Sequence, residues 1–206
     1  MSSEKLDFTN TKLALQHQTD KELKHAQFLF KILLFGWIGN VLSSLGEIAL
    51  KLKLPVKGLI KKTIYKQFVG GENQKEYDPV ISKLYKHKVH TILDYSVEGQ
   101  EEEKEFEQTK ETLLNILSQA KVNSAIPITC LKISGLASNF LLEKYSNKLT
   151  LNESEQLAWE QLLVRLDEIF KKASEISKPI YVDAEETWIQ PAIDDLCETF
   201  MSKYNK

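Results

Sequence analysis

The sequence is poor in arginine, in cysteine and in net charge. Of its 27 basic residues only Arg165 is an arginine, so lysine carries nearly all of the positive charge. A formal net charge of −2 creates no field that would attract nucleic acid, and no nucleic-acid partner is expected. The two cysteines, Cys130 and Cys197, form no CxxC motif. This argues against a zinc site or a disulfide framework and favours a reducing compartment.

Long apolar runs are also absent. The most apolar stretch, residues 26–39, has 14 residues and is interrupted by Lys31. A membrane-spanning helix needs about 20 apolar residues, so this stretch predicts a buried helix, with a membrane-surface helix as the alternative. The polar start, residues 1–10, is typical of neither a signal peptide nor a transit peptide. The chain also contains no GxGxxG motif, no P-loop and no GxSxG elbow.

Residues 1–86 are predicted to form a helical region. Apolar periodicity predicts one helix over residues 20–35, capped at Asp20, and a second over residues 38–50 that ends before Pro55. A short helix is expected over residues 79–86.

From residue 87 onward, short apolar runs alternate with amphipathic helices. Strands are predicted at residues 89–95, 125–133 and 179–182, and helices at residues 101–121, at residues 152–176 and from just before Pro191. This alternation is typical of a parallel sheet covered by helices. We therefore expect an α/β fold, a partial (β/α)8 TIM-like barrel of about three βα units. A closed barrel needs eight strands and about 250 residues, so residues 87–206 are expected to be an incomplete barrel.

Each predicted strand has an ionisable residue near its carboxyl end: Asp94, Lys132 and Asp183. Functional residues of parallel α/β sheets lie beyond those ends. Lys132 interrupts an apolar run, which is costly unless the ammonium is paired, so we expect it to face Asp183. Glu185 and Glu186 have a simpler interpretation as acids at the start of the last helix.

A metal-dependent barrel enzyme is the less favoured alternative. In that hypothesis Asp94, Asp183 and Glu185 would hold a divalent cation through their carboxylates.

Several segments resemble proline dehydrogenases, most closely the single-function enzymes. Residues 93–99 (LDYSVEG) resemble the family's first strand, residues 131–136 (LKISGL) its lysine strand, and residues 182–188 (VDAEETW) its acid strand. Upstream, residues 58–60 and 67–71 (QFVGG) are similar to the helices that precede the barrel. The resemblance covers nearly the whole chain.

This resemblance implies a (β/α)8 barrel that binds FAD and oxidises L-proline to Δ1-pyrroline-5-carboxylate. Hydride passes to the flavin, and the electrons then pass to a membrane quinone. Lys132 would line the substrate pocket, Asp183 would pair with it and fix substrate and cofactor, and these two are the expected catalytic residues. Ala184 would offer backbone contact to the flavin, and Glu98 would close the pocket through an ion pair. The family implies a cytoplasmic location, either free or peripheral at the inner membrane.

Other functional elements of that family have no counterpart in this sequence. These are a glutamine on the fifth strand, an Arg-Val-Lys run on the sixth strand and an arginine pair on the last helix. We therefore expect a truncated enzyme that lacks the C-terminal half of its barrel and is inactive alone. The alternative is a non-catalytic remnant, or a half-barrel that pairs with another chain.

Overall fold

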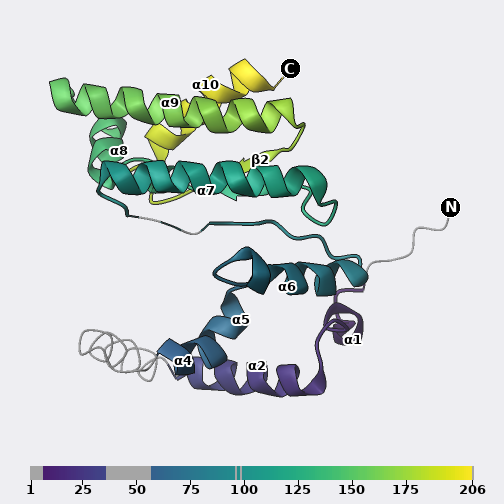
Figure 1. Cartoon of the computed structure of the whole chain (residues 1–206). Coiled ribbons are helices and arrows are strands. Elements are labelled where there is room, and N and C mark those ends of the chain that lie inside the picture. Colours follow the sequence, from purple (N-terminus) through teal and green to yellow (C-terminus); the bar gives the residue numbers. More distant parts are fainter. Residues whose placement is uncertain (1–6, 36–56, 96, 98, 206) are drawn as a thin grey trace. The chain divides into compact units, whose positions relative to one another are not determined.

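The computed structural model describes residues 7–35, 57–95, 97 and 99–205. The chain divides into two compact units, Met1–Val89 and His90–Lys206 (Figure 1). The helix predicted over residues 38–50 lies outside the described residues. Among the residues that are described, no helix is both long enough and apolar enough to cross a bilayer.

The first unit is built from helices. They are α1 (Thr11–Ala14), α2 (Asp20–Leu33), α4 (Lys57–Ile60), the π-helical turn η1 (Lys61–Tyr65), α5 (Lys66–Phe68) and α6 (Gln74–Lys86). Helix α6 begins five residues before the predicted helix at residues 79–86. Pro79 lies inside α6. Its ring removes only one intrahelical hydrogen bond, so the helical turn before it still forms.

The cap of α2 is Thr19, one residue before the predicted Asp20. Thr19 and Glu22 form a reciprocal capping box, in which each side chain accepts a hydrogen bond from the other residue's backbone. Lys83 of α6 reaches the same carboxylate, with Nζ 2.9 Å from Glu22 Oε2. The hydrogen bond from the Thr19 backbone N–H, followed by the one from the Lys83 side chain, lowers the pKa of Glu22 to about 2. The cap therefore also ties α2 to α6.

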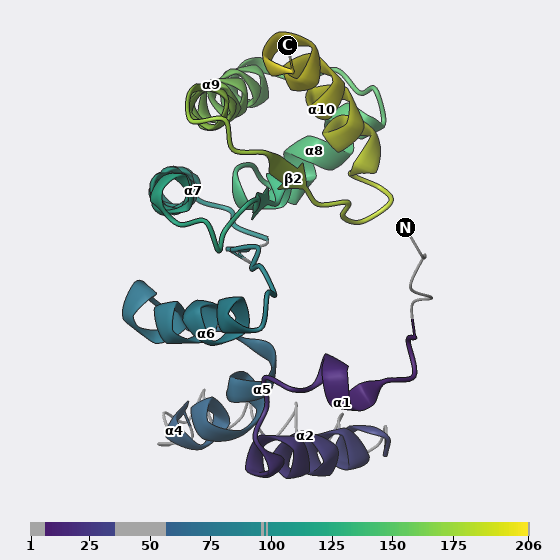
Figure 2. The ribbon, with the colours of Figure 1, turned by 90° about the vertical axis from the view of Figure 1, so that its right-hand side faces the viewer.

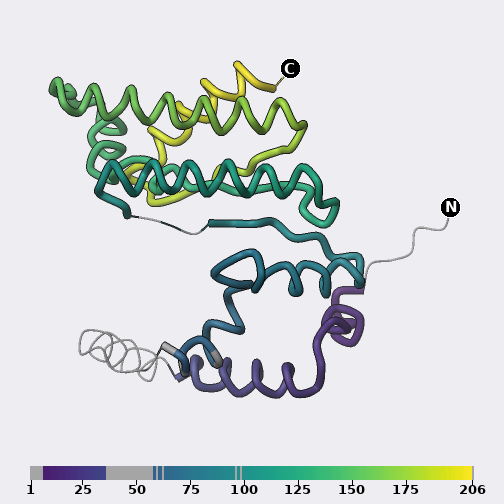
Figure 3. The backbone as a smooth tube through the Cα atoms, in the orientation of Figure 1, coloured from purple at the N-terminus to yellow at the C-terminus, as the bar shows by residue number. Residues whose placement is uncertain are grey.

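The second unit combines a small parallel sheet with four helices and a 3₁₀ turn, among the described residues. The elements are α7 (Glu103–Val122), β1 (Thr129–Leu131), the turn η2 (Ile133–Gly135), α8 (Asn139–Ser146), α9 (Glu153–Glu175), β2 (Ile180–Val182) and α10 (Gln190–Tyr204). Figure 3 lets the reader follow the backbone from α9 through β2 into α10. Figure 2 shows α9 and α10 lying next to each other, with α8 close to α10.

The sheet is parallel, as predicted, but its strands are shorter than expected. β1 pairs with β2 in the register Cys130↔Tyr181, and Leu93 adds a single parallel bridge to Thr129. Residues 89–95 and 125–128 therefore lie outside the regular ladder. Pro127 has no N–H to donate to a ladder, which ends β1 on its amino side. Beyond Lys132 the chain turns into η2.

The predicted long helices are confirmed to within two residues of their ends. α7 and α9 run side by side (Figure 1), and Pro191 lies in the first turn of α10, where its missing N–H costs nothing. The sequence pattern predicted no element between residues 134 and 151, where the structure has α8. Ser138 is the N-cap of that helix and accepts a hydrogen bond from Leu141 N.

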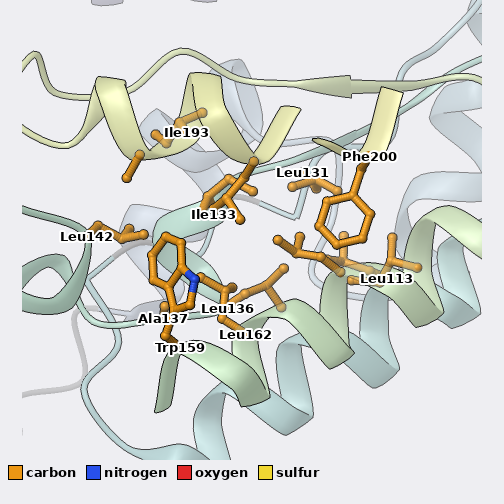
Figure 4. Packing of buried hydrophobic residues seen from close by; sticks show 14 of the residues in the cluster. Leu113, Leu131, Ile133, Leu136, Ala137, Leu142, Trp159, Leu162, Ile193 and Phe200 are labelled. Atoms are coloured by element: carbon orange, nitrogen blue, oxygen red, sulfur yellow. The ribbon is translucent and has the colours of Figure 1, made fainter. Parts of the chain in front are cut away.

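Apolar side chains from the sheet and all four helices form one core. Figure 4 shows Leu131 of β1 and Ile133 of η2 among residues from α7, α9 and α10. Leu162 of α9 and Leu136 after η2 have no exposed surface. Burying each such side chain contributes about 1.5–3 kcal/mol. This packing holds β1, β2 and the turns at their carboxyl ends in place.

Candidate functional site at the carboxyl ends of the strands

Lys132 and Asp183 follow directly after the two paired strands. Because the register places Leu131 beside Val182, the next residues along the chain are neighbours. Asp183 N donates to Leu131 O at 3.0 Å, which continues the ladder by one step. Lys132 Nζ lies 3.0 Å from Asp183 Oδ2, and the exposed fractions of the two side chains are 16% and 42%. The structure thus joins the two residues in an ion pair that is open to solvent on its aspartate side.

Cys130 contacts the other oxygen of the same carboxylate. Its Sγ donates to Asp183 Oδ1 at 3.5 Å, so both carboxylate oxygens of Asp183 have partners. Burial, and to a smaller extent the negative charges of Asp183 and Asp94, raises the pKa of Cys130 to about 12. The thiol is therefore neutral at physiological pH, where it acts as a hydrogen-bond donor.

Asp94 lies at the same edge of the sheet. Leu93 bridges to Thr129, and Cys130 N donates to Leu93 O at 3.3 Å, which sets the chain beside β1. Asp94 follows at once, is exposed, and is close enough to Cys130 to influence its pKa. The three strand-end positions predicted from the sequence therefore meet at one edge.

The remaining expected site residues have different outcomes. Ala184 is exposed directly after Asp183 at this edge. Glu98 lies outside the described residues. The inference about Glu185 and Glu186 as helix-start acids is wrong, because α10 begins at Gln190 and has no acid in its first turn.

The structure gives Glu185 a contact that sequence reasoning missed. Its carboxylate accepts from Ser134 N at 3.1 Å and from the Ser134 hydroxyl. The only signal in the sequence was that each residue lies two positions after a member of the Lys132–Asp183 pair. Glu185 therefore joins the loops that follow β1 and β2.

The geometry does not favour the metal hypothesis. In the part of the chain that the structure describes, no three His, Cys, Asp or Glu side chains come together as a metal-ligand group. Glu185, one of the three proposed ligands, is directed to Ser134.

Arg165 lies between α7 and α9 and is only 2% exposed. Its Nε is 2.8 Å from Glu107 Oε1, a second nitrogen contacts Glu103, and Nη1 donates to Leu136 O at 3.0 Å. Burial lowers the pKa of this guanidinium. The single arginine of the chain is thus committed to holding the two helices and the end of η2.

Comparison with known proteins places these residues in a family. The family model for proline dehydrogenase matches residues 78–206, which include both strands and the Lys132–Asp183 pair. Proline dehydrogenase 1, mitochondrial, of Dictyostelium discoideum is 29% identical over 244 aligned positions, which cover 100% of this chain and 42% of that protein. The carbapenem antibiotics biosynthesis protein CarD of Pectobacterium carotovorum subsp. carotovorum is 30% identical over 139 residues, 68% of this chain and 37% of that protein.

A solved structure supports the fold. Proline utilization A (PutA) from Bdellovibrio bacteriovorus, inactivated by N-propargylglycine, superposes with a TM-score of 0.51 and 20% identity over 70% of this chain and 16% of that chain. The chain spans about two fifths of the length of the two curated relatives. Because the family model covers well over half of its residues, the chain belongs to the proline dehydrogenase family.

Proposed function

We propose that this chain forms part of a flavin-dependent proline dehydrogenase that oxidises L-proline to Δ1-pyrroline-5-carboxylate. The observation that carries the proposal is the Lys132–Asp183 ion pair at the carboxyl edge of the parallel sheet, within the segment that the family model matches. We also propose the finer fold on which this depends, the first βα units of a (β/α)8 barrel, with the bridge at Leu93, β1 and β2 as neighbouring strands.

The residues at this edge fit part of a flavin and substrate site. Side chains alternate between the two faces of a strand, so Tyr181 and Asp183 share a face, as do Ile92 and Asp94. Tyr181 and Ile92 are 54% and 44% exposed, which leaves an apolar surface next to the charged pair. A ligand with a flat apolar ring next to an anionic group would match this combination of an apolar surface and a charged pair. Flavin, when bound, supplies the acceptor for the hydride.

The chain's own residues would bind and orient the substrate. The Lys132 ammonium offers a charge-assisted hydrogen bond to the carboxylate of proline. Asp183 would hold that ammonium in place, and the Cys130 thiol holds Asp183 from its other side. The backbone of Ala184 would contact the flavin, and Glu98 would close the pocket through an ion pair.

From the same family resemblance we propose a membrane quinone as the final electron acceptor. A protein that delivers electrons to a quinone would act from the cytoplasm or from a peripheral position at the inner membrane.

A titration followed by NMR tests the function. We expect FAD and L-proline to shift the signals of Lys132, Asp183 and Ala184, and Lys132→Ala to weaken binding by at least about tenfold, since a charged hydrogen bond contributes about 1.5–3 kcal/mol. Lys144 is a matched control, because it forms a comparable ion pair with Glu155 at 2.6 Å. Lys144→Ala should leave the titration unchanged.

Binding to the chain alone should be weak, because the only guanidinium is buried in the α7–α9 interface. Bidentate recognition of a carboxylate requires a guanidinium group, and a lysine ammonium does not have the geometry to replace it. A purified chain with a bound-flavin spectrum that bleaches on addition of proline would contradict weak binding. If neither ligand shifts the strand-end signals, the proposed function is wrong.

A second candidate function is a half-barrel that pairs with another chain. The observation that favours it is the open side of β2, where Tyr181 and Met201 are more than half exposed beside a cavity of about 840 Å³. Exposed strand edges of this kind are normally covered. Sedimentation of the purified chain tests this candidate, and a monomer at all concentrations would count against self-pairing.

A further inference from the structure

Glu185 and Ser134 repeat the spacing of the catalytic pair. Ser134 lies two residues after Lys132, and Glu185 lies two residues after Asp183. The two loops therefore contact each other twice beyond the sheet, once through Lys132 and Asp183 at 3.0 Å and once through Ser134 N and Glu185 Oε1 at 3.1 Å. The Ser134–Glu185 contact therefore joins the segment after β1 to the segment after β2, next to the Lys132–Asp183 pair.

The Ser134–Glu185 contact is buried on its serine side. Ser134 is 1% exposed, and both its N–H and its hydroxyl donate to the Glu185 carboxylate. Hydrogen bonds to a charged acceptor are stronger than neutral ones, and a buried donor that loses its acceptor costs about 1–3 kcal/mol. The contact is therefore a strong constraint on the position of η2.

The η2 turn is also held on its other sides. A Cβ on Gly135 would lie 2.8 Å from Val97 O, so the backbone passes close to the segment after Asp94. The carbonyl of Leu136 accepts from Arg165 at 3.0 Å. With these contacts in place, the Glu185 carboxylate fixes η2 to the loop after β2.

The Glu185 side of the contact is anchored as well. Glu185 N donates to Gln190 Oε1 at 2.9 Å, and Gln190 Nε2 donates to Asp194 at 2.7 Å. The loop that carries Asp183 is therefore tied to the first turn of α10. A helix-dipole role does not account for Glu185, because α10 begins five residues later.

We propose that Glu185 is a positioning residue that, through Ser134, holds Lys132 against Asp183. The catalytic role of Glu185 rests on the proposed function, but its effect on the position of Lys132 does not. Without the bridge, the loop after β1 would move relative to the loop after β2, and the ammonium would leave its carboxylate partner.

The test is the acetylation rate of Lys132, measured by peptide mass spectrometry on the full 206-residue chain. The rate is divided by that of Lys144, whose side chain is 21% exposed against 16% for Lys132. This ratio reports local release of Lys132, whereas general loss of stability raises both rates. Glu185→Gln and Ser134→Ala should each raise the ratio roughly fivefold, the factor that matches about 1 kcal/mol for one hydrogen bond.

Two controls decide the interpretation. Glu186→Gln removes the same charge from the neighbouring exposed residue and should leave the ratio unchanged. The double variant Ser134→Ala/Glu185→Gln should release Lys132 no more than Glu185→Gln alone, because the two residues act as a unit. An equal effect of Glu186→Gln, additive effects in the double variant, or no change in the Glu185→Gln ratio would overturn the proposal.

Glu185→Asp provides a milder variant if the others fail to fold. It keeps the charge but is one methylene shorter, so it cannot satisfy both Ser134 donors, and the ratio should rise by a smaller factor. No rise in a folded Glu185→Asp protein would also overturn the proposal. Acetylation requires no flavin, so failure of the chain to bind FAD contradicts the proposed function and leaves this result standing.

Discussion

At the scale of single residues, Arg165 and Cys130 belong to residue types that are rare in this sequence. The structure gives both of them polar partners that the sequence did not predict. Arg165 is enclosed between α7 and α9 by Glu103 and Glu107. Cys130 faces Asp183 and keeps its proton because burial disfavours the thiolate. The sequence placed both among apolar neighbours, but their polar contacts come from other elements.

The Cys130 thiol yields a pH prediction. Its pKa rises from an ordinary 9.0 to about 12 on folding, so the folded state keeps a proton that the unfolded state loses. The contribution to stability is fully present below pH 9.0 and is lost as pH rises towards about 12. Iodoacetamide labelling of Cys130 should therefore begin at higher pH in the folded chain than in urea. Asp183→Asn should lower that onset only partly, because burial is the larger cause. Identical pH profiles in the folded and unfolded chain would contradict this prediction.

At the scale of elements, the short turn η2 links more parts of the second unit than its length suggests. It follows Lys132, contacts Glu185 through Ser134, approaches Val97 at Gly135, and is followed by Leu136, whose carbonyl binds Arg165. The sequence pattern placed Ile133 at the end of a strand and predicted no element for the two residues that follow it. Its role depends on segments from three other places along the chain.

Gly135→Ala tests this close approach. The new Cβ would lie 2.8 Å from Val97 O, a contact that forces the backbone to shift, and we expect a loss of about 1–3 kcal/mol in unfolding free energy. Urea denaturation measures it. Gly58→Ala in α4 is the control, because a Cβ there meets nothing within 4 Å, and alanine in a helix gains up to about 1 kcal/mol over glycine. Equal effects of the two substitutions would show that the contact at Gly135 is unimportant.

At the scale of the whole molecule, the two units differ in how many of their described apolar residues are buried. The large apolar cluster runs from Leu113 to Phe200 and lies entirely in the second unit. In the first unit, the described apolar residues that are buried are Leu29 and Ile81. We propose a helical region at residues 1–86 and the barrel segment at residues 87–206, a boundary three residues before the division at Val89.

Residues 90–206 should therefore fold without residues 1–89. A fragment of this size can bury enough apolar surface to be stable, and it retains the whole cluster of buried apolar residues. We expect a cooperative thermal transition by circular dichroism with a midpoint close to that of the full chain. A fragment that melts without cooperativity would show that the first unit is needed for the core.

The sequence by itself determined the parallel α/β order, the long helices and the meeting of Asp94, Lys132 and Asp183 at one edge. These follow from local periodicity and from the rule that parallel strands share a carboxyl edge. The sequence pattern did not predict helix α8, which depends on the Ser138 cap. It also did not predict how short the strands are, which depends on Pro127.

Only the tertiary structure decided which partners complete the edge. Ser134 and Glu185 are 51 residues apart, Cys130 and Asp183 are 53 apart, and Glu107 and Arg165 are 58 apart. No local pattern encodes such pairs, because each depends on how helices pack against the sheet. The ionisable residues at the strand ends could be identified from the sequence, whereas the contacts that hold these residues in place form only when the core folds.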